Sequence, residues 1–390
     1  MTYDYAPAAP PDLATLGGIL SHGFGFPESA APDWFARSGH ENLRVLKRGD
    51  AVVGGLISIP MGQWFGGHAV PTLGFAGVGI SPAFRGEGAA TQMMLAGLRE
   101  ARARRIPLST LYPATVTLYR RAGYERAGAR YATRLDLRAM RFRRDPGLVV
   151  REEQAVPEVF RALYTRFASA RQGFLDRGPY VWQRVWQPRD LSTRSFGLYR
   201  GDALEGYVVV ANRMGEGEGV ITVTDMVAIT AAAGESILSL LCDYRSIAPA
   251  ATWHGQPGGI FGMLLPERHH ETTLRDFFML RVVDPELALA QRGYPRRGAA
   301  RVSFELDDGS LPECSGTYTV RVDHGKVSVE RSTSPARARM SERALAALYA
   351  GFLGPDELAV LGMLDAEEVD RESMAWLFGS ASPPTMSDMF

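Results

Sequence analysis

The residues best suited to chemistry lie in the stretch VGISPAFRGEGAATQMM, which runs from Val78 to Met94. An apolar strand ends at Ile80, Pro82 stops its hydrogen-bonded ladder, and a helix follows the glycines. Glycines let the backbone approach a ligand closely, and the free N–H groups and positive dipole of a first helical turn attract anions. The stretch therefore predicts a turn that cradles a pyrophosphate, to which Arg85 adds a positive charge.

Two other phosphate-binding motifs do not fit this stretch. A Rossmann fingerprint needs Gly-x-Gly-x-x-Gly and a later acid for the ribose, and a P-loop needs Gly-Lys followed by Ser or Thr. On Gly86 and Gly88 alone, a strand-to-helix loop whose glycines serve only for turning is the simpler interpretation. The wider pattern favours a ligand site.

That wider pattern resembles the acetyl-CoA site of the GNAT acetyltransferases. A strand and a proline precede Arg-x-x-Gly-x-Ala at the start of a helix, and LYRRAGYERAGARY follows further on, with Tyr119 four residues before Gly123 and Tyr124. The resemblance implies that Tyr119 is a general acid, because a phenol with a pKa of about 10 is protonated at neutral pH and can protonate a departing thiolate. An isolated tyrosine would instead indicate an amphipathic surface side chain. The residues that the resemblance assigns to acetyl-CoA are Val78, Gly79, Ile80, Arg85, Gly86, Glu87, Gly88, Ala89 and Ala90.

Three features together resemble the Eis (enhanced intracellular survival) family over essentially the whole chain. They are an intact GNAT unit, a degenerate GNAT repeat and a C-terminal α+β domain, with RVVDPELALAQRGY at the junction and FGFPESAAPDW near the N-terminus. The resemblance implies a sterol-carrier-protein-like third domain and a homo-hexamer built as a trimer of dimers. It also implies that the carboxylate of Phe390, in the final stretch ASPPTMSDMF, reaches the active site as general base.

The implied reaction is direct attack of a primary amine on the thioester of acetyl-CoA. Backbone N–H groups around Val78 and Ile80 are expected to hold the pantetheine arm and to polarise the thioester oxygen. A free α-carboxyl has an intrinsic pKa of about 3.5, which makes it a weak base. Burial among Met386, Met389 and the terminal ring is expected to raise that pKa and so to help the base.

The acceptor pocket is implied, again by resemblance, to lie along HGFGFPESAAPDW. The candidate residues there are Phe24, Phe26, Glu28 and Trp34. Family members that take polycationic substrates such as aminoglycosides carry acids in this stretch and just before the terminal Phe. This chain has Gly23 and Met389 at those places, with Asp388 one residue earlier. We therefore predict a less charged or more apolar amine in place of an aminoglycoside, either an arylalkylamine or an amino group on a metabolite.

The elements that must position these residues fall in a first segment, residues 1–143. It opens with a helical pattern, followed by two β-rich runs around the Gly-Asp turn of LRVLKRGDAVVGGLISIPM. An apolar strand TLGFAGVGI, the helix after the glycines and a short buried strand LSTLYP complete the segment. We predict that it is the catalytic GNAT domain.

The rest of the chain is predicted to hold a degenerate repeat, residues 144–284, and a third domain, residues 285–390. LYRGDALEGYVVV repeats the design of LKRGDAVVGGLIS, but the second copy lacks the Arg-Gly-x-Gly turn. The polar stretch RFRRDPG (141–147) is predicted to link the copies. Strands followed by helices indicate a small α+β domain at the end. The predicted fold class is mixed α/β, with tandem GNAT folds before a sterol-carrier-like domain.

Composition excludes several other classes of function. Lysine plus arginine balance aspartate plus glutamate at 43 each, which argues against nucleic-acid and membrane-surface partners. Two distant cysteines and no signal-peptide pattern favour the cytoplasm. ERHHE (267–271) lacks metal-ligand spacing and is predicted to be a polar surface run, so we expect no metal; MGEGEGV (214–220) is predicted to be a hairpin loop. Two alternatives remain open: a non-catalytic acetyl-CoA sensor, and a lipid- or ligand-binding module that uses the sterol-carrier-like domain.

Overall fold

The computed structural model describes residues 3–153, 158–189, 191–213, 219–266 and 269–390. Most of the predicted loop at 214–220 lies outside the described residues. The chain forms two compact units. The first unit comprises Met1–Gly128, Phe277–Pro384 and Phe390, and the second comprises Ala129–Asp276 and Thr385–Met389. Among the described residues, every helix is too short or too polar to cross a membrane.

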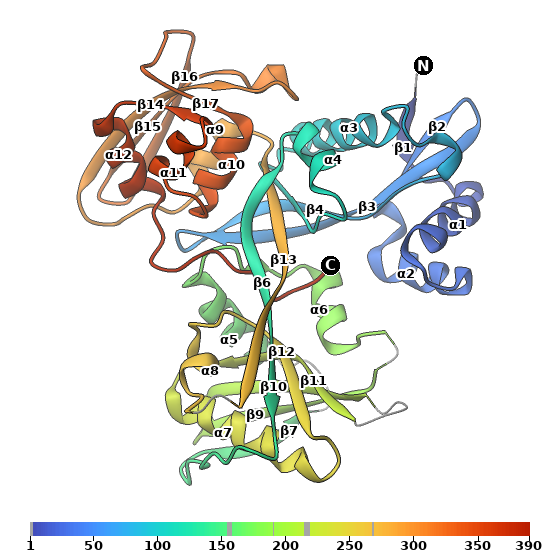
Figure 1. The fold of residues 1–390 in the computed structure, drawn as a ribbon, viewed down its shortest axis with the longest axis vertical. Coiled ribbons are helices and arrows are strands. Elements are labelled where there is room, and N and C mark those ends of the chain that lie inside the picture. The colour runs from blue at the N-terminus through green and yellow to red at the C-terminus, as the bar shows by residue number, and fades with distance from the viewer. Residues whose placement is uncertain (1–2, 154–157, 190, 214–218, 267–268) are drawn as a thin grey trace. The chain divides into compact units, whose positions relative to one another are not determined.

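The N-terminal part of the first unit is a sheet with helices on both faces. Its helices are α1 (Leu13–Phe24), α2 (Ala31–Ser38), α3 (Ala89–Ala103) and α4 (Val116–Arg121), and its strands are β1 (Asp4–Pro7), β2 (Leu43–Arg48), β3 (Ala51–Phe65), β4 (His68–Ile80) and β5 (Leu108–Leu111). The strands follow the order β1-β2-β3-β4-β5. Helices α1 and α2 cover one face, and α3 and α4 cover the other (Figure 1).

The second unit repeats this plan, as the sequence predicts. Its elements are β7 (Val149–Glu153), α5 (Glu158–Ser169), β8 (Leu175–Asp176), α6 (Pro179–Trp186), β9 (Thr193–Arg200), β10 (Ala203–Arg213), β11 (Val220–Ala228), α7 (Ala231–Cys242), β12 (Ala250–His254) and α8 (Ile260–Met263). The strands run in the order β12-β11-β10-β9-β7. The two Gly-Asp turns match in conformation as well as sequence, since Gly49 has φ +59° and Gly201 has φ +61°. Glycine adopts this left-handed conformation without steric cost.

In each unit, the strand that pairs with the last strand named above comes from a distant part of the chain, which the sequence does not indicate. In the first unit, β5 pairs with Met279–Val282 at the end of β13 (His270–Val282). In the second unit, β12 pairs with residues 132–136 of β6 (Glu125–Asp136). The chain leaves the first unit within β6 and returns within β13, so the two repeats exchange their final strands. The predicted domain boundaries at residues 143 and 284 stay predictions.

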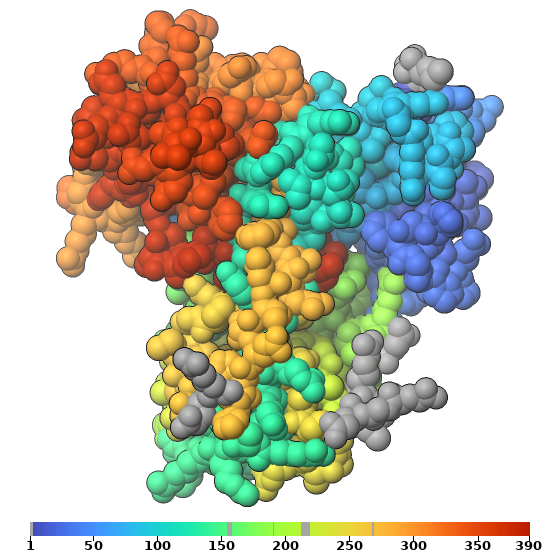
Figure 2. All heavy atoms as spheres, in the orientation of Figure 1, coloured from blue at the N-terminus to red at the C-terminus, as the bar shows by residue number. Residues whose placement is uncertain are grey.

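The C-terminal part of the first unit is an α+β domain, which confirms the predicted class. Its elements are α9 (Pro285–Gln291), β14 (Ala299–Asp307), β15 (Gly316–Asp323), β16 (Lys326–Ser332), β17 (Ala338–Ser341), α10 (Glu342–Ala350), α11 (Pro355–Val360), β18 (Leu364–Asp365) and α12 (Glu368–Phe378). The sheet order is β16-β15-β14-β17-β18. In the space-filling view this part forms one continuous mass, coloured orange to red (Figure 2).

A buried ion pair joins the α+β domain to the N-terminal sheet of the first unit. Arg281, on β13, donates to Asp308 Oδ2 at 2.5 Å, and both side chains are fully buried. Gly123 lies against the pair, because a Cβ there would come within 2.7 Å of the Arg281 Nε atom. The loop that follows α4 is thus held by contacts with the α+β domain.

Removal of Asp308 is expected to destabilise the first unit strongly. Asp308→Ala would leave the Arg281 guanidinium buried without a carboxylate, which typically costs about 3 to 5 kcal/mol. The matched control is Glu305→Ala on β14, the strand that directly precedes Asp308, because the ion pair of Glu305 with Arg339 is solvent-exposed and is worth at most about 1 kcal/mol. Urea unfolding midpoints would compare the two variants; similar midpoints would contradict the prediction.

Candidate active site

The candidate site begins where strands β4 and β5 separate. Their parallel pairing covers only Thr72–Gly74 against Leu108–Thr110, whereas β4 continues to Ile80. A bulge in β4 widens the gap, because Gly77 and Val78 together face one residue of β3 and Gly77 takes φ +58°. The backbone of residues 75–80 is therefore paired with β3 on one side and is not paired with β5 on the other. Val78, Gly79 and Ile80 all lie on this splayed end.

The glycine turn leads from this strand end into α3. Gly86 and Gly88 have φ +85° and +80°, and a Cβ on either would meet nothing within 4 Å. The first i to i−4 bond of the helix runs from Gln92 N to Gly88 O, at 3.0 Å. The N–H groups before that of Gln92, from Gly88 to Thr91, therefore have no acceptor within the helix. The turn presents open backbone and a positive helix end, as an anion cradle requires.

The two charged residues of the turn make different contacts. The Arg85 Nε donates to the Ile80 carbonyl at 3.1 Å, so the side chain bridges the turn to the strand end. The Glu87 carboxylate accepts from Tyr3 and Arg48, each at 3.1 Å. Glu87 therefore ties the turn to β2, and its side chain is directed to protein partners.

Tyr119 lies at the end of α4, in the same apolar cluster as the strand end and the start of α3. That cluster contains Ile80, Ala89 and Tyr119, with Val78 and Ala90 packed against it. The Tyr119 side chain is 4 % exposed, and burial raises its pKa to about 12. The phenol is thus a proton donor at neutral pH.

Tyr124 shares the cluster but has a structural role. Its ring meets that of Tyr119 edge-on, with centroids 6.1 Å apart. Its hydroxyl lies 2.7 Å from Ser109 Oγ, and Ser109 in turn donates to the Leu73 carbonyl at 2.8 Å. The hydroxyl therefore links the loop after α4 to β5 and β4.

Phe390 lies at the point where β4 and β5 separate. A Cβ on Gly74 would come within 2.8 Å of its ring, and the Tyr112 ring centroid is 5.8 Å from its own. Gly74 is the last residue of β4 that pairs with β5, and Tyr112 directly follows β5. The residue is 8 % exposed. The fold therefore brings Phe390 to the point where the splayed part of β4 begins.

The four predicted acceptor residues divide into an aromatic group and a separate acid. Trp34 contacts Phe24 and Phe26 edge-on, at centroid distances of 6.4 and 5.5 Å. The Trp34 ring covers the bulge, since a Cβ on Gly77 would lie 2.8 Å from it. Glu28 is exposed, and its carboxylate lies beside Gly18 of α1.

The second unit keeps the splayed strands and loses the anion cradle. Strand β11 pairs with β12 only over Val220–Thr222 and then continues to Ala228. Helix α7 begins at Ala231 and is capped by Thr230, whose hydroxyl accepts from the Ala233 N–H at 3.2 Å and donates to Glu205 at 2.7 Å. A capped helix end beside a carboxylate does not attract a phosphate.

The contacts of the final residues correct one expectation and add a feature that the sequence did not indicate. Met386 is buried as predicted, but Met389 is 40 % exposed, so the expectation that both methionines pack inward was wrong for Met389. Asp388 is buried instead, and Arg177 binds it through Nη2 at 2.8 Å. An acid amid apolar residues near the chain end was the only available signal.

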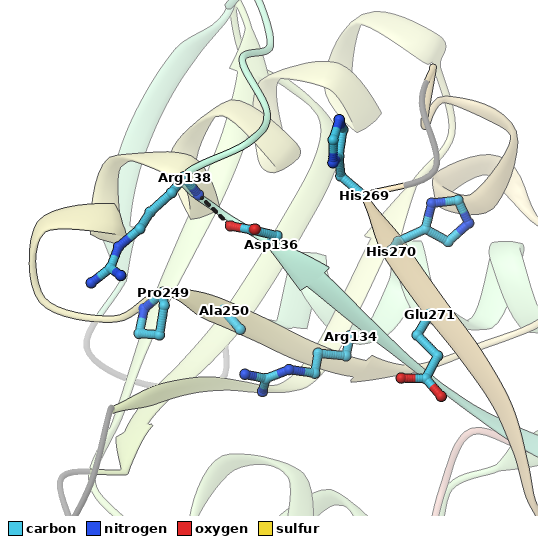
Figure 3. Close-up of a pocket in the computed structure, with 8 residues that line it drawn as sticks. All are labelled: Arg134, Asp136, Arg138, Pro249, Ala250, His269, His270 and Glu271. Atoms are coloured by element: carbon cyan, nitrogen blue, oxygen red, sulfur yellow. Dashed lines mark hydrogen bonds between the residues drawn. The ribbon is translucent and has the colours of Figure 1, made fainter.

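The histidine run of the second unit lines an open pocket of ≈ 520 Å³. Figure 3 shows the imidazoles of His269 and His270 pointing in different directions, while Glu271 is directed away from both. Within the described ranges, no group of three or more His, Cys, Asp or Glu side chains is arranged to hold a metal ion.

Three family models match the chain. Residues 5–127 match an acetyltransferase (GNAT) domain, residues 173–282 match a second one, and residues 285–387 match a sterol carrier protein domain. A Streptomyces coelicolor protein described as an uncharacterized N-acetyltransferase is 26% identical over 348 residues, which cover 83% of this chain and 80% of that protein.

Solved structures match over the whole length. Eis1 from Mycobacterium abscessus, 20% identical with a TM-score of 0.78, shares the fold over 100% of both chains. A GCN5-related N-acetyltransferase from Anabaena variabilis is 31% identical with a TM-score of 0.94, again over 100% of both chains. The chain therefore belongs to the GCN5-related N-acetyltransferase (GNAT) family, as an N-acetyltransferase with two GNAT domains and a sterol carrier protein domain.

Proposed function

We propose that the protein transfers an acetyl group from acetyl-CoA to a primary amine, with Tyr119 as general acid and the Phe390 carboxylate as general base. The family implies an acyl-CoA co-substrate. The observation that carries the proposal is that the splayed β4 end, the start of α3 and Tyr119 belong to one apolar cluster, with Phe390 where β4 and β5 separate.

The step is a direct displacement at the thioester carbon. The amine nitrogen forms a bond to that carbon, the carbon–sulfur bond breaks, and the amine proton passes to the Phe390 carboxylate. Tyr119 donates its proton to the departing thiolate. Val78, Gly79 and Ile80 would hold the pantetheine arm with their backbone, and one N–H would polarise the thioester oxygen. Residues 85–90 would hold the pyrophosphate, with Arg85 as its cation.

The acceptor is proposed to be an apolar or weakly charged amine. The aromatic group around Trp34 offers ring faces for such a substrate, and Phe24 remains 49 % exposed. Asp388 is the acid nearest the chain end, and its charge is already paired with Arg177. Of the four predicted acceptor residues, Glu28 alone carries a negative charge that could pair with a polycation.

An amine panel tests the proposed function. Thiol release from acetyl-CoA would be followed with arylalkylamines, aliphatic monoamines and aminoglycosides, and we expect the highest kcat/KM with the arylalkylamines. Preference for aminoglycosides would overturn the acceptor class. Acetyl-CoA binding without turnover on any amine would favour a sensor, and failure to bind acetyl-CoA would favour a ligand-binding module.

Gly88→Ala is expected to weaken acetyl-CoA binding selectively. The added Cβ projects into open space at the cradle and keeps the phosphate from the backbone. Loss of one hydrogen bond to a charged group predicts an increase of at least about tenfold in the KM for acetyl-CoA. Gly49→Ala is the matched control, because Gly49 has φ +59° and equally open surroundings in the β2–β3 turn. Both variants should lose about 1 to 2 kcal/mol of stability. An equal rise in the KM for acetyl-CoA in both variants would refute the turn at Gly88 as the phosphate site.

The assembly and location are proposed by resemblance to the Eis family. We propose a homo-hexamer built as a trimer of dimers, which sedimentation equilibrium would test. A cytoplasmic location agrees with the buried, unpaired state of Cys242 and Cys314.

A further inference from the structure

One buried arginine of the second unit binds the residues that precede Phe390. Arg177 is 1 % exposed and faces two carboxylates. Its two terminal nitrogens donate to Asp225 at 2.6 and 2.9 Å, and its Nε donates to both Asp388 oxygens at 3.0 Å. The guanidinium thus links strand β11 to the tail, which we define as residues 385–389.

Two tyrosines complete the environment of these charges. The Tyr207 hydroxyl donates to Asp225 at 2.6 Å, and the Tyr164 hydroxyl lies 3.2 Å from Asp388. The guanidinium stacks over the Tyr164 ring, 3.6 Å from its centroid. Burial opposes the charge of Arg177, but Asp225 and Asp388 outweigh it and raise the pKa of Arg177. All three guanidinium nitrogens of Arg177 thus have a carboxylate partner, and removing Asp388 would leave the buried Nε without its acceptor.

The backbone of the tail is also bound by the second unit. The Thr385 N–H donates to Gln172 O at 3.0 Å, and the Met386 N–H donates to Ala129 O at 3.1 Å. Arg130 Nε donates to the Ser387 carbonyl at 3.2 Å. These contacts hold residues on both sides of Met386, which is itself fully buried.

The tail lies against the splayed part of β11. Asp225 is beyond the pairing of β11 with β12, which ends at Thr222. Ser387 lines a small cavity together with residues 223–227, Trp253 and His254. The equivalent splay of the first unit forms the proposed acyl-CoA cleft. In the second unit this part of the fold binds a peptide of the same chain.

We propose that the second GNAT domain is a docking site for the tail, with Arg177 and Asp388 as positioning residues for the Phe390 carboxylate. Only Met389 separates Asp388 from Phe390, and two residues span at most about 7 Å. An Asp388 that is held therefore limits the travel of the carboxylate. The inference rests on the proposed function, in which that carboxylate is the base.

The docking is tested by access of a carboxypeptidase to a chain that ends at Phe390. We expect Asp388→Ala to accelerate the release of Phe390 by at least about 30-fold, because cleavage follows the undocked population and one partner of a buried charge pair is lost. Each rate would be divided by that of a free peptide with the same last residues. Asp356→Ala, which removes an exposed ion pair with Arg371, is the control and should not change the rate.

Acetyl transfer gives a second readout. Asp388→Ala should lower kcat and leave the KM for acetyl-CoA unchanged. Asp388→Asn keeps an acceptor for Arg177, so its kcat should lie between that of the native protein and that of Asp388→Ala. If a carboxypeptidase releases Phe390 from Asp388→Ala at the same rate as from the native protein, the docking is overturned. Faster release in Asp388→Ala, with full activity in a chain extended by two glycines after Phe390, would support the docking and overturn the Phe390 carboxylate as base.

Discussion

A chain extended by two glycines after Phe390 is expected to bind acetyl-CoA normally and to transfer acetyl groups at least about 100-fold more slowly. The extension converts the Phe390 carboxylate into a neutral amide, which accepts no proton from the amine. The new carboxylate lies up to about 7 Å further along the chain. Isothermal titration with acetyl-CoA and steady-state turnover with the best amine would measure the two effects separately.

The pH dependence gives this prediction a second signature. Without a base, only amine that is already deprotonated in water reacts, so kcat/KM of the extended chain should keep rising towards the pKa of the amine, about 10.4 for a lysine-like group. Phe390→Leu is the matched control, because it keeps a carboxylate at residue 390 and changes only the ring that lies on Gly74. Undiminished turnover in the extended chain would exclude the carboxylate as base.

The strand end, the glycine turn and the helix after it could be predicted from the sequence because their determinants are local. The apolar strand, Pro82 and the glycines are consecutive, and the left-handed φ of Gly86 and Gly88 agrees with the predicted turn. The duplication was visible for the same reason, since both Gly-Asp hairpins use one glycine conformation. Periodicity and turn residues report such short-range structure well.

The exchange of β6 and β13 could not be predicted, because strand pairing over a long distance leaves no local signal. The sequence of residues 132–136 does not show whether they pair with β5 of the first repeat or with β12 of the second. Likewise, 211 residues separate Arg177 from Asp388, and no spacing rule connects them. The sequence shows Asp388 one residue before Met389, but the partner that binds it comes only from the fold.

Tyr119→Phe is expected to lower kcat by about 10²- to 10⁴-fold, the usual contribution of a positioned general acid. The ring would stay in its cluster with Ile80 and Ala89, so binding of acetyl-CoA should not change. Tyr124→Phe is the matched control: its ring lies 6.1 Å away, and its hydroxyl bonds only within the fold, to Ser109. That control should cost about 1 kcal/mol of stability and leave kcat nearly unchanged.

The buried state of Tyr119 sets the alkaline behaviour of the native enzyme. A phenol with an ordinary pKa of about 10 would be half ionised at pH 10, and half of its acid catalysis would be lost there. Because burial raises the pKa of Tyr119 to about 12, the acid form persists, and kcat should not fall between pH 7 and about pH 10. Equal activity of Tyr119→Phe and Tyr124→Phe across this range would refute Tyr119 as the acid. A reduced but pH-independent kcat in Tyr119→Phe alone is the expected result, because the thiolate then leaves without a proton at every pH.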